Sequence, residues 1–188
     1  MAQTASQPTL SVAEYLRGEQ LSELRHEYVA GQVYAMAGAT DVHGLLAGNL
    51  FAALRPHLRG GPCQLFVANM KVRLQVAGED IFYYPDLVLS CDSEDRERYW
   101  RSHPCLLVEV LSEASERIDR REKFLAYTTL PSLQEYLLIA QDRQEVTIYR
   151  RRANWHGEVL RQGELRLDCL GELSLPLAVI YEEVVFPG

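Results

Sequence analysis

The stretch Cys105-Leu106-Leu107-Val108-Glu109-Val110-Leu111-Ser112 decides the fold, because it predicts a strand at the centre of a sheet. It is a nearly continuous run of apolar, β-prone residues, the pattern of a strand that is covered on both faces. Glu109 stands in the middle of this run. An unpaired carboxylate in such a place is costly or takes up a proton, so we expect a compensating partner nearby.

The segments around this strand predict an α/β or α+β fold with a mixed sheet flanked by helices. Their central order is helix, strand, strand, strand, helix, strand, which implies a hairpin and then a crossover through a helix to a parallel strand. Additional elements precede and follow this core. The expected elements are a helix over 11–17, a strand over 28–36, a helix over 41–58, strands over 63–76, 82–90 and 105–111, a helix from Ser112 or Ser115 to about Thr129, strands over 134–140 and 144–151, and short β pieces over 153–181.

Length and composition favour one globular domain over residues 1–188. A chain of 188 residues can bury a sizeable core. No stretch approaches the roughly 20 apolar residues of a membrane helix, and the first eight residues lack the features of a signal peptide. We therefore expect a cytoplasmic protein without membrane association. The 4 cysteines are scattered without zinc-ligand spacing, and the cytosol disfavours disulfides, so we expect free thiols.

The charge distribution bounds the possible partners. A net charge of −7 argues against a passive, charge-driven coat on nucleic acid, but it does not exclude an enzyme that acts on nucleic acid. Basic residues gather around 117–123 and 150–152. These clusters could contact phosphates locally, and the alternative is a solvated charged face.

Two carboxylates on separate strands, Asp86 and Glu109, form a candidate metal site. The segment Tyr83-Tyr84-Pro85-Asp86-Leu87-Val88-Leu89 predicts the strand that carries Asp86. If the two strands pair with aligned faces, the carboxylates lie close together and need compensation. Mg²⁺ would supply it, since it prefers a few carboxylate oxygens, water and substrate phosphate, and it could activate water at a phosphodiester. The alternative is that Asp86 ends a strand and Glu109 pairs with an arginine.

Lys123 is a candidate partner of these carboxylates. It lies four residues after Asp119, on the same face of the expected helix, beside a stripe in which Ile118 and Leu125 face the sheet. From there its ammonium could position an attacking water or stabilise a developing oxyanion. The alternative is an ordinary surface pair between Lys123 and Asp119.

His43 and Glu27 are two further candidates. His43 lies in the first turn of the helix over 41–58, at the end of its inward stripe, and could reach a metal-bound water or a phosphate. A hydrogen-bonded structural histidine is the alternative. Glu27 precedes the strand that starts at Tyr28 and could be a third carboxylate, or it could pair on the surface with Arg25 or His26.

The ordered set of these residues resembles a known family. Pro85-Asp86 followed by Glu109 on an apolar strand resembles the PD-(D/E)XK nuclease superfamily. A longer pattern, over about residues 10–182, is similar to the Uma-type family of restriction endonucleases, formerly a domain of unknown function. The pattern consists of Tyr-Val-Ala-Gly-Gln-Val-Tyr-Ala-Met-Ala-Gly-Ala at 28–39, His43, Tyr-Tyr-Pro-Asp-Leu-Val-Leu at 83–89, Leu-Val-Glu-Val-Leu-Ser at 107–112, Asp119, Lys123, Tyr127 and Glu-Tyr-Leu-Leu-Ile at 135–139.

The resemblance implies a restriction-endonuclease-like fold that hydrolyses phosphodiester bonds with Mg²⁺, or Mn²⁺ in its place. By position, Asp86 and Glu109 would be the metal carboxylates, and the backbone carbonyl of Val110 an additional ligand. His43 and Glu27 match positions near the site. The superfamily lysine is expected two residues after Glu109, where this chain has a leucine. Lys123 resembles the migrated lysine of this branch, since a long side chain can reach one spot from two backbones.

Two functions from different classes follow. The first is a metal-dependent DNA endonuclease without an organic cofactor, acting as a homodimer because two-fold symmetry matches a duplex cut on both strands. The second is a nuclease-like binding or assembly module without catalysis. RNA is a third option, as a different substrate for the same chemistry. Mg²⁺ binding separates the first two hypotheses, and cleavage of DNA and RNA side by side separates the substrates.

Overall fold

The computed structural model describes residues 9–36, 38–113, 115–171 and 173–186. Its α-helices are α1 (Val12–Leu21), α2 (Asp41–Leu54), α3 (Glu116–Ile118), α4 (Phe124–Tyr127) and α5 (Leu177–Ile180). Its strands are β1 (His26–Val29), β2 (Gln32–Ala35), β3 (Gln64–Val67), β4 (Lys71–Val76), β5 (Glu79–Tyr83), β6 (Leu87–Ser90), β7 (Trp100–Arg101), β8 (Leu106–Leu111), β9 (Glu135–Ala140), β10 (Val146–Arg150), β11 (Gly157–Leu160), β12 (Glu164–Leu167) and β13 (Leu173–Pro176).

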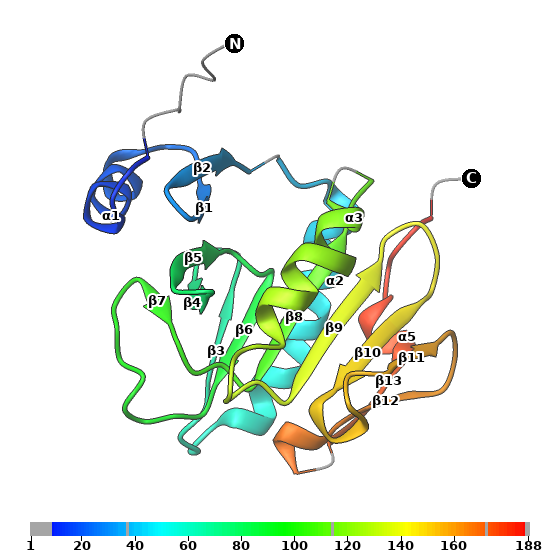
Figure 1. Ribbon diagram of the computed structural model, residues 1–188. Helices are drawn as coiled ribbons and strands as arrows, with labels where there is room; N and C mark the ends of the chain where they lie inside the picture. Colours follow the sequence, from blue (N-terminus) through cyan, green and yellow to red (C-terminus); the bar gives the residue numbers. More distant parts are fainter. Residues whose placement is uncertain (1–8, 37, 114, 172, 187–188) are drawn as a thin grey trace.

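A six-stranded mixed sheet with the order β11-β10-β9-β8-β6-β3 forms the centre of the fold. Strand β8 is buried along its whole length, as its sequence predicts. It pairs antiparallel with β6 and parallel with β9, and α3 and α4 make the crossover between β8 and β9. Figure 1 shows α2 on one side of β8 and the α3–α4 segment on the other. The expected crossover to a parallel strand is therefore confirmed.

The two faces of this sheet carry separate apolar cores, as the alternation of side chains along a strand requires. One core contains Leu46 and Leu50 of α2, packed with Val108 and Val110 of β8. The other contains Tyr127 of α4, together with Leu107 and Leu111 of β8 and Val88 of β6. Glu109 has the same parity as Leu107 and Leu111, so it lies on the face that α4 covers.

A second sheet, with the order β2-β1-β5-β4-β7, lies beside the central one (Figure 1). Helix α1 packs on it through an aromatic cluster of Tyr15, Tyr28 and Phe82. Ser11 caps this helix in a capping box with Glu14, which confirms the helix start that the sequence predicts. A separate two-stranded hairpin consists of β12 and β13.

Two expected strands are each divided between the two sheets, so the expectation of continuous strands over 63–76 and 82–90 is wrong. The first breaks into β3 and β4 at Ala68, whose φ of 62° is left-handed and ends the extended backbone. The second breaks into β5 and β6 at the segment 84–86, which contains Pro85. The break places Asp86 at the junction of the two sheets, next to the first residue of β6.

The helix expected from 112 to 129 is also divided. A short α3 is followed by a π-helical segment, Asp119–Lys123, and then by α4. A π turn accommodates one more residue than an α turn, so it shifts the residues after it around the helix axis. Leu125 is consequently 66% exposed instead of facing the sheet, and Ala126 and Tyr127 are buried in its place.

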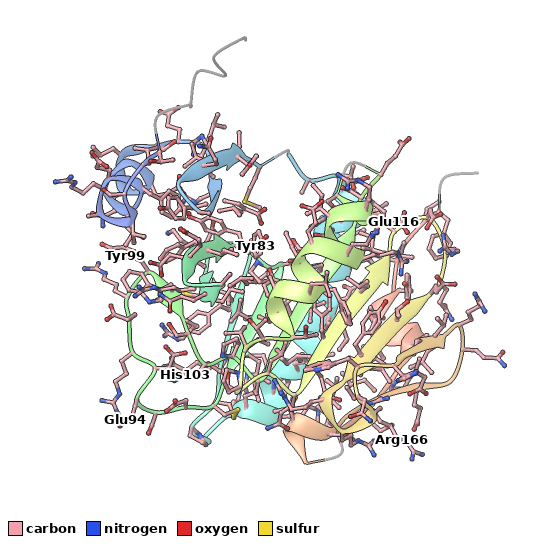
Figure 2. All side chains as sticks on the ribbon, in the orientation of Figure 1. Tyr83, Glu94, Tyr99, His103, Glu116 and Arg166 are labelled. Atoms are coloured by element: carbon pink, nitrogen blue, oxygen red, sulfur yellow. A yellow bond between two sulfur atoms is a disulfide. The ribbon has the colours of Figure 1, made fainter. Side chains whose placement is uncertain are left out.

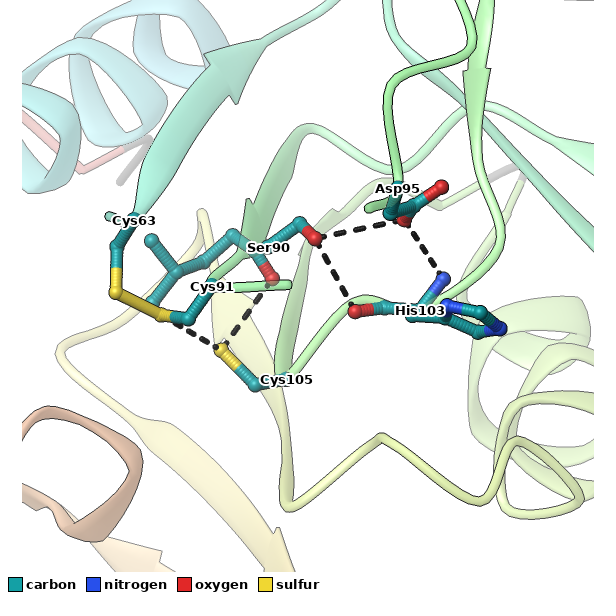
Figure 3. The surroundings of a disulfide bond; sticks show 7 residues. Cys63, Ser90, Cys91, Asp95, His103 and Cys105 are labelled. Carbon is teal, nitrogen blue, oxygen red and sulfur yellow. Dashed lines mark hydrogen bonds between the residues drawn. A yellow bond between two sulfur atoms is a disulfide. The ribbon is translucent and has the colours of Figure 1, made fainter. Parts of the chain in front are cut away.

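The cysteines also depart from expectation, because Cys63 and Cys91 form a disulfide (Figure 3). Cys63 directly precedes β3 and Cys91 directly follows β6, and these strands pair with Gln64 opposite Ser90. The pairing register therefore brings together two cysteines that lie 28 residues apart. Cys105 and Cys169 are free, as expected. No helix within the described ranges is long and apolar enough to cross a membrane.

Candidate active site

Strand pairing brings Asp86 and Glu109 together. Leu87 of β6 pairs with Val108 of β8 in an antiparallel ladder, so the same register continued by one residue places Asp86 opposite Glu109. Directly opposed residues of an antiparallel pair project to one face of the sheet. Val88, which shares the parity of Asp86, lies in the core beneath α4. The two carboxylates therefore belong to one face and one end of the same strand pair.

Glu109 is buried and finds its partners on the helical crossover. Its Oε1 accepts hydrogen bonds from Lys123 Nζ at 3.2 Å and from the hydroxyl of Tyr127 at 3.0 Å. Burial raises its pKa well above the ordinary value, because desolvation and the charges of Asp119, Asp86 and Glu27 outweigh the attraction of Lys123. The partner of Glu109 is thus a lysine, and the alternative of an arginine pair is wrong.

Lys123 lies among three carboxylates. Its Nζ is 2.9 Å from Glu27 Oε1, 3.2 Å from Glu109 Oε1 and 3.2 Å from Asp119 Oδ1. The side chain is buried, so the alternative of a surface pair with Asp119 is wrong. Burial alone would lower the pKa of Lys123, but the attraction of the three carboxylates raises it well above the ordinary value. Lys123 is therefore protonated at neutral pH and supplies positive charge to this group.

Asp86 is held by a histidine and by the backbone of β8. Its Oδ1 lies 2.7 Å from His43 Nε2, and its Oδ2 accepts a 2.7 Å hydrogen bond from the Val110 N–H. Burial lowers the pKa of His43, but the hydrogen bond and the charge of Asp86, with a contribution from Asp119, raise it above 6.5 overall. The N-terminus of α2, capped by the Thr40 hydroxyl, fixes His43 in this position. The contact that Val110 makes with Asp86 is through its N–H.

Glu27 on β1 reaches the same cluster from the second sheet. Besides Lys123, its Oε1 contacts the backbone N–H of Tyr84 at 3.3 Å. The expected alternative, a surface pair with Arg25 or His26, is wrong, because His26 pairs with Glu19 instead. The five candidate side chains come from five different segments and form two contact groups, Glu27 with Lys123 and Glu109, and Asp86 with His43. The pairing of β6 with β8 relates the two groups, because its register places Asp86 opposite Glu109.

Asp119 and Tyr127 belong to the same group, although neither was among the candidate site residues. The Asp119 side chain is almost completely buried, and its Oδ1 has no hydrogen-bond partner among the described residues, although it lies within ion-pair distance of Lys123. Its backbone carbonyl accepts a hydrogen bond from the Tyr136 hydroxyl at 3.1 Å. The spacing of Asp119 and Tyr127 at four residues on either side of Lys123 is the sequence signal that could have identified them.

The donor set and the charge of this group fit a hard divalent cation. Three carboxylates, those of Glu27, Glu109 and Asp119, surround the ammonium of Lys123, and a fourth, that of Asp86, contacts the imidazole of His43. Carboxylate oxygens are the ligands that Mg²⁺ prefers, and Mg²⁺ commonly uses only one or two of them beside water and substrate phosphate. Within the part of the chain that the structure describes, no three His, Cys, Asp or Glu side chains form a ready-made metal cage.

Comparisons with known proteins show the family of the chain. A family model described as "Uma2: Putative restriction endonuclease" matches residues 12–178. Two uncharacterized proteins of Synechocystis sp. (strain ATCC 27184 / PCC 6803 / Kazusa) are similar to the chain. The first is 34% identical over 183 residues, covering 95% of each protein. The second is 32% identical over 154 residues, covering 80% of this chain and 86% of the relative.

One solved structure supports the fold. The crystal structure of "a putative nuclease belonging to DUF820" from Anabaena variabilis ATCC 29413 matches with a TM-score of 0.73 and 17% sequence identity. The match covers 94% of this chain and 99% of the other. At this identity the similarity shows the fold alone, and it confirms the mixed α/β architecture that the sequence predicts.

Proposed function

This chain belongs to the Uma2 family, and we propose that it is a Mg²⁺-dependent endonuclease that hydrolyses phosphodiester bonds in DNA. The observation that supports the proposal is the buried contact of Glu109 with Lys123, together with a strand register that places Asp86 opposite Glu109. An excess of buried negative charge in one place is expensive unless a cation balances it. A group of this kind at the junction of the two sheets is suited to binding a cation and a phosphate together.

In this proposal Asp86 and Glu109 hold Mg²⁺, with Mn²⁺ as a substitute and the carbonyl of Val110 as an additional expected ligand. When bound, the cation lowers the pKa of a water molecule and offsets the charge that develops on the phosphoryl oxygens. The raised pKa of Lys123 prevents it from acting as a base at neutral pH. Its ammonium instead offers fixed positive charge and a hydrogen-bond donor to the attacking water or the phosphoryl oxygens.

His43 and Glu27 act on these groups as positioning residues. Protonated His43 donates from Nε2 to Asp86 and, together with the Val110 N–H, fixes the orientation of the carboxylate. Glu27 holds the ammonium of Lys123 from the opposite side. Preorganised groups of this kind need no rearrangement at the moment of reaction, which is the main electrostatic advantage of an enzyme site.

The proposed substrate also implies an assembly and a location. One such site cuts one strand, so cleavage of both strands of a duplex calls for a homodimer whose two-fold axis matches that of the DNA. A cellular DNA substrate places the protein in the cytoplasm. Of the two basic clusters, the one at 150–152 is less suited to DNA binding, because Arg150 is buried and pairs with Glu135 at 3.3 Å.

A binding or assembly module with the same fold is the second candidate function. It is favoured by the ion pairs of Lys123, which balance part of the carboxylate charge without a metal ion. In that case the cluster would be a structural element of the protein. The two functions differ in whether Mg²⁺ binds and whether Asp86 is needed for any activity.

A cleavage assay tests the proposal directly. A DNA duplex and an RNA of the same sequence are incubated with the protein in Mg²⁺, in Mn²⁺ and in EDTA. We expect cleavage of the DNA only when the metal is present, and none by Asp86→Ala. The control variant is Asp142→Ala, which removes an exposed aspartate paired with Arg143 and should retain full activity. Full activity of Asp86→Ala would refute its assigned role.

A further inference from the structure

A polar cavity lies between α1, β4 and the loop that enters β7. It has a volume of about 430 Å³, within the range of small-ligand sites. Three basic residues, Arg25, Lys71 and Arg98, line it together with the aromatic residues Tyr84 and Tyr99. The cavity thus combines positive charge with aromatic rings, which is the combination that binds single nucleotides of a nucleic-acid strand.

Lys71 is the most informative lining residue. It is only 6% exposed, and its Nζ forms no hydrogen bond or ion pair with any residue in the described ranges. The contacts of the ammonium are with two rings, whose centroids lie 5.0 Å away at Tyr84 and 6.0 Å away at Tyr99. Burial lowers the pKa of Lys71 and the charge of Arg25 adds to this effect, although the charge of Glu19 partly offsets it. Because no direct ion pair compensates the loss of solvent, an anion in the cavity would stabilise the ammonium.

One carboxylate, that of Glu19, also lines the cavity, and it is already engaged. Its Oε2 accepts a 2.6 Å hydrogen bond from the Tyr84 hydroxyl, and its Oε1 lies 2.8 Å from Nδ1 of His26. It forms no ion pair with Lys71. Arg25 and Arg98 are exposed at the rim of the cavity. The cavity therefore keeps an excess of positive charge, which favours an anionic ligand.

We propose that this cavity binds the phosphate of a nucleotide, with Lys71 at its base, Arg25 and Arg98 at its rim, and the exposed ring of Tyr99 stacked against the base. Tyr84 connects the cavity with the candidate active site, because its ring lines the cavity and its backbone N–H contacts Glu27 Oε1 at 3.3 Å. The source of the bound nucleotide depends on the proposed function. In a DNA endonuclease it is a nucleotide of the substrate strand close to the bond that is cut, and a free nucleotide offers the same chemistry.

Calorimetric titration with thymidine 5′-monophosphate in EDTA tests the inference without any need for cleavage. Thymidine and inorganic phosphate are titrated separately, and we expect both to bind more weakly than the nucleotide. Lys71→Met should weaken nucleotide binding by about tenfold or more, the loss expected for a charge-assisted contact. The control variant is Arg166→Gln, which removes an exposed arginine on β12, far from Tyr99 in Figure 2, and should bind like the wild type.

A purely structural role for Lys71 makes a different prediction. If Lys71 only supported the fold, Lys71→Met would lower the melting temperature, whereas an unpaired ammonium replaced by an apolar side chain should leave it unchanged or raise it. Tyr99→Ala and Arg98→Gln, in the exposed loop before β7, provide the same binding test without touching the interior. Tyr99→Ala should weaken the binding of the nucleotide and leave that of inorganic phosphate unchanged.

Several results would overturn the inference. The inference is refuted if the wild type does not bind the nucleotide. It is also refuted if the wild type, Lys71→Met and Arg98→Gln bind the nucleotide with equal affinity. Binding of inorganic phosphate as tightly as the nucleotide would refute the stacking at Tyr99. The inference and the proposed function can fail separately. DNA cleavage without nucleotide binding would refute the nucleotide site in the cavity. Lys71-dependent nucleotide binding without any cleavage would refute the endonuclease activity. A thymidine dinucleotide bound more tightly than the mononucleotide would identify a strand as the source.

Discussion

Replacing Glu109 by glutamine should stabilise the metal-free protein, although the substitution removes half of a buried ion pair. The variant loses the charge in the 3.2 Å contact with Lys123 and keeps an oxygen that can accept from the Tyr127 hydroxyl. Lys123 is not left unpaired, because Glu27 at 2.9 Å and Asp119 at 3.2 Å remain. The variant gains relief from the burial of a charge and from repulsion by the remaining carboxylates.

The balance of these effects is a stabilisation of about 1–2 kcal/mol, since removing a buried charge without orphaning its partner is commonly favourable. For a chain of this length that corresponds to a rise in melting temperature of about 2–8 °C. The rise should depend on pH. The folded-state pKa of Glu109 is raised above its unfolded value of 4.5. The stability that its protonated form contributes is therefore fully present below pH 4.5 and is lost as the pH rises through the folded-state pKa.

The assay is thermal unfolding followed by circular dichroism in EDTA, from about pH 4 to pH 8. The difference between Glu109→Gln and the wild type should be small at the acidic end and grow with pH. The matched control is Glu79→Gln, which alters an exposed glutamate at the start of β5 and should change stability by less than about 0.5 kcal/mol. A lower melting temperature for Glu109→Gln, or a difference that does not change with pH, would refute the reasoning.

Three further perturbations test other parts of the structure. Lys123→Met should lower the free energy of unfolding in urea by about 3–5 kcal/mol, because three carboxylates lose the ammonium between them. A decrease below about 1 kcal/mol would contradict the ion-pair network. His43→Gln should lower the melting temperature more at about pH 6 than at pH 9. Because the pKa of His43 is raised, the stabilisation by its charge is fully present below pH 6.5 and is lost as the pH rises through the folded-state pKa. An equal decrease in melting temperature at both pH values would show that the charge of His43 does not contribute to stability. Reductant should destabilise the wild type by about 3.5 kcal/mol, the value expected for a disulfide across 28 residues, and should not affect Cys63→Ser. A wild-type melting temperature unaffected by reductant would argue against the Cys63–Cys91 bond.

The part of the site that the sequence could predict is the part encoded by local patterns. The apolar run around Glu109 identifies a strand buried on both faces, and a buried strand with a charge at its centre requires a partner. The strand that follows Pro85 and the helix that follows β8 are likewise visible as short-range patterns. These three segments carry Asp86, Glu109 and Lys123, and the connection between them follows from the right-handed crossover of parallel strands.

Features that depend on one unusual backbone conformation were not predictable. Ala68 takes a left-handed φ, a conformation in which glycine or asparagine would be the usual signal, so the division between β3 and β4 has no mark in the sequence. The sequence pattern likewise does not predict the π turn over 119–123. It rotates Leu125 outwards, and it accompanies the burial of Asp119 and Lys123 on the inner side.

The disulfide illustrates a second limit, because it depends on long-range register. Cys63 and Cys91 become neighbours only when β3 and β6 pair with Gln64 opposite Ser90. Neither the spacing of the cysteines nor the composition of their segments predicts that strand register. The expectation of free thiols is therefore wrong for Cys63 and Cys91, because the pairing of β3 with β6 makes them neighbours.

Anomalous diffraction at the manganese absorption edge, from a crystal grown in Mn²⁺, would locate the divalent ion. We expect a peak between the carboxylates of Asp86 and Glu109, and none in crystals of Asp86→Ala. Manganese found elsewhere, with the two carboxylates keeping only their present protein partners, would show that these acids do not hold a divalent ion together.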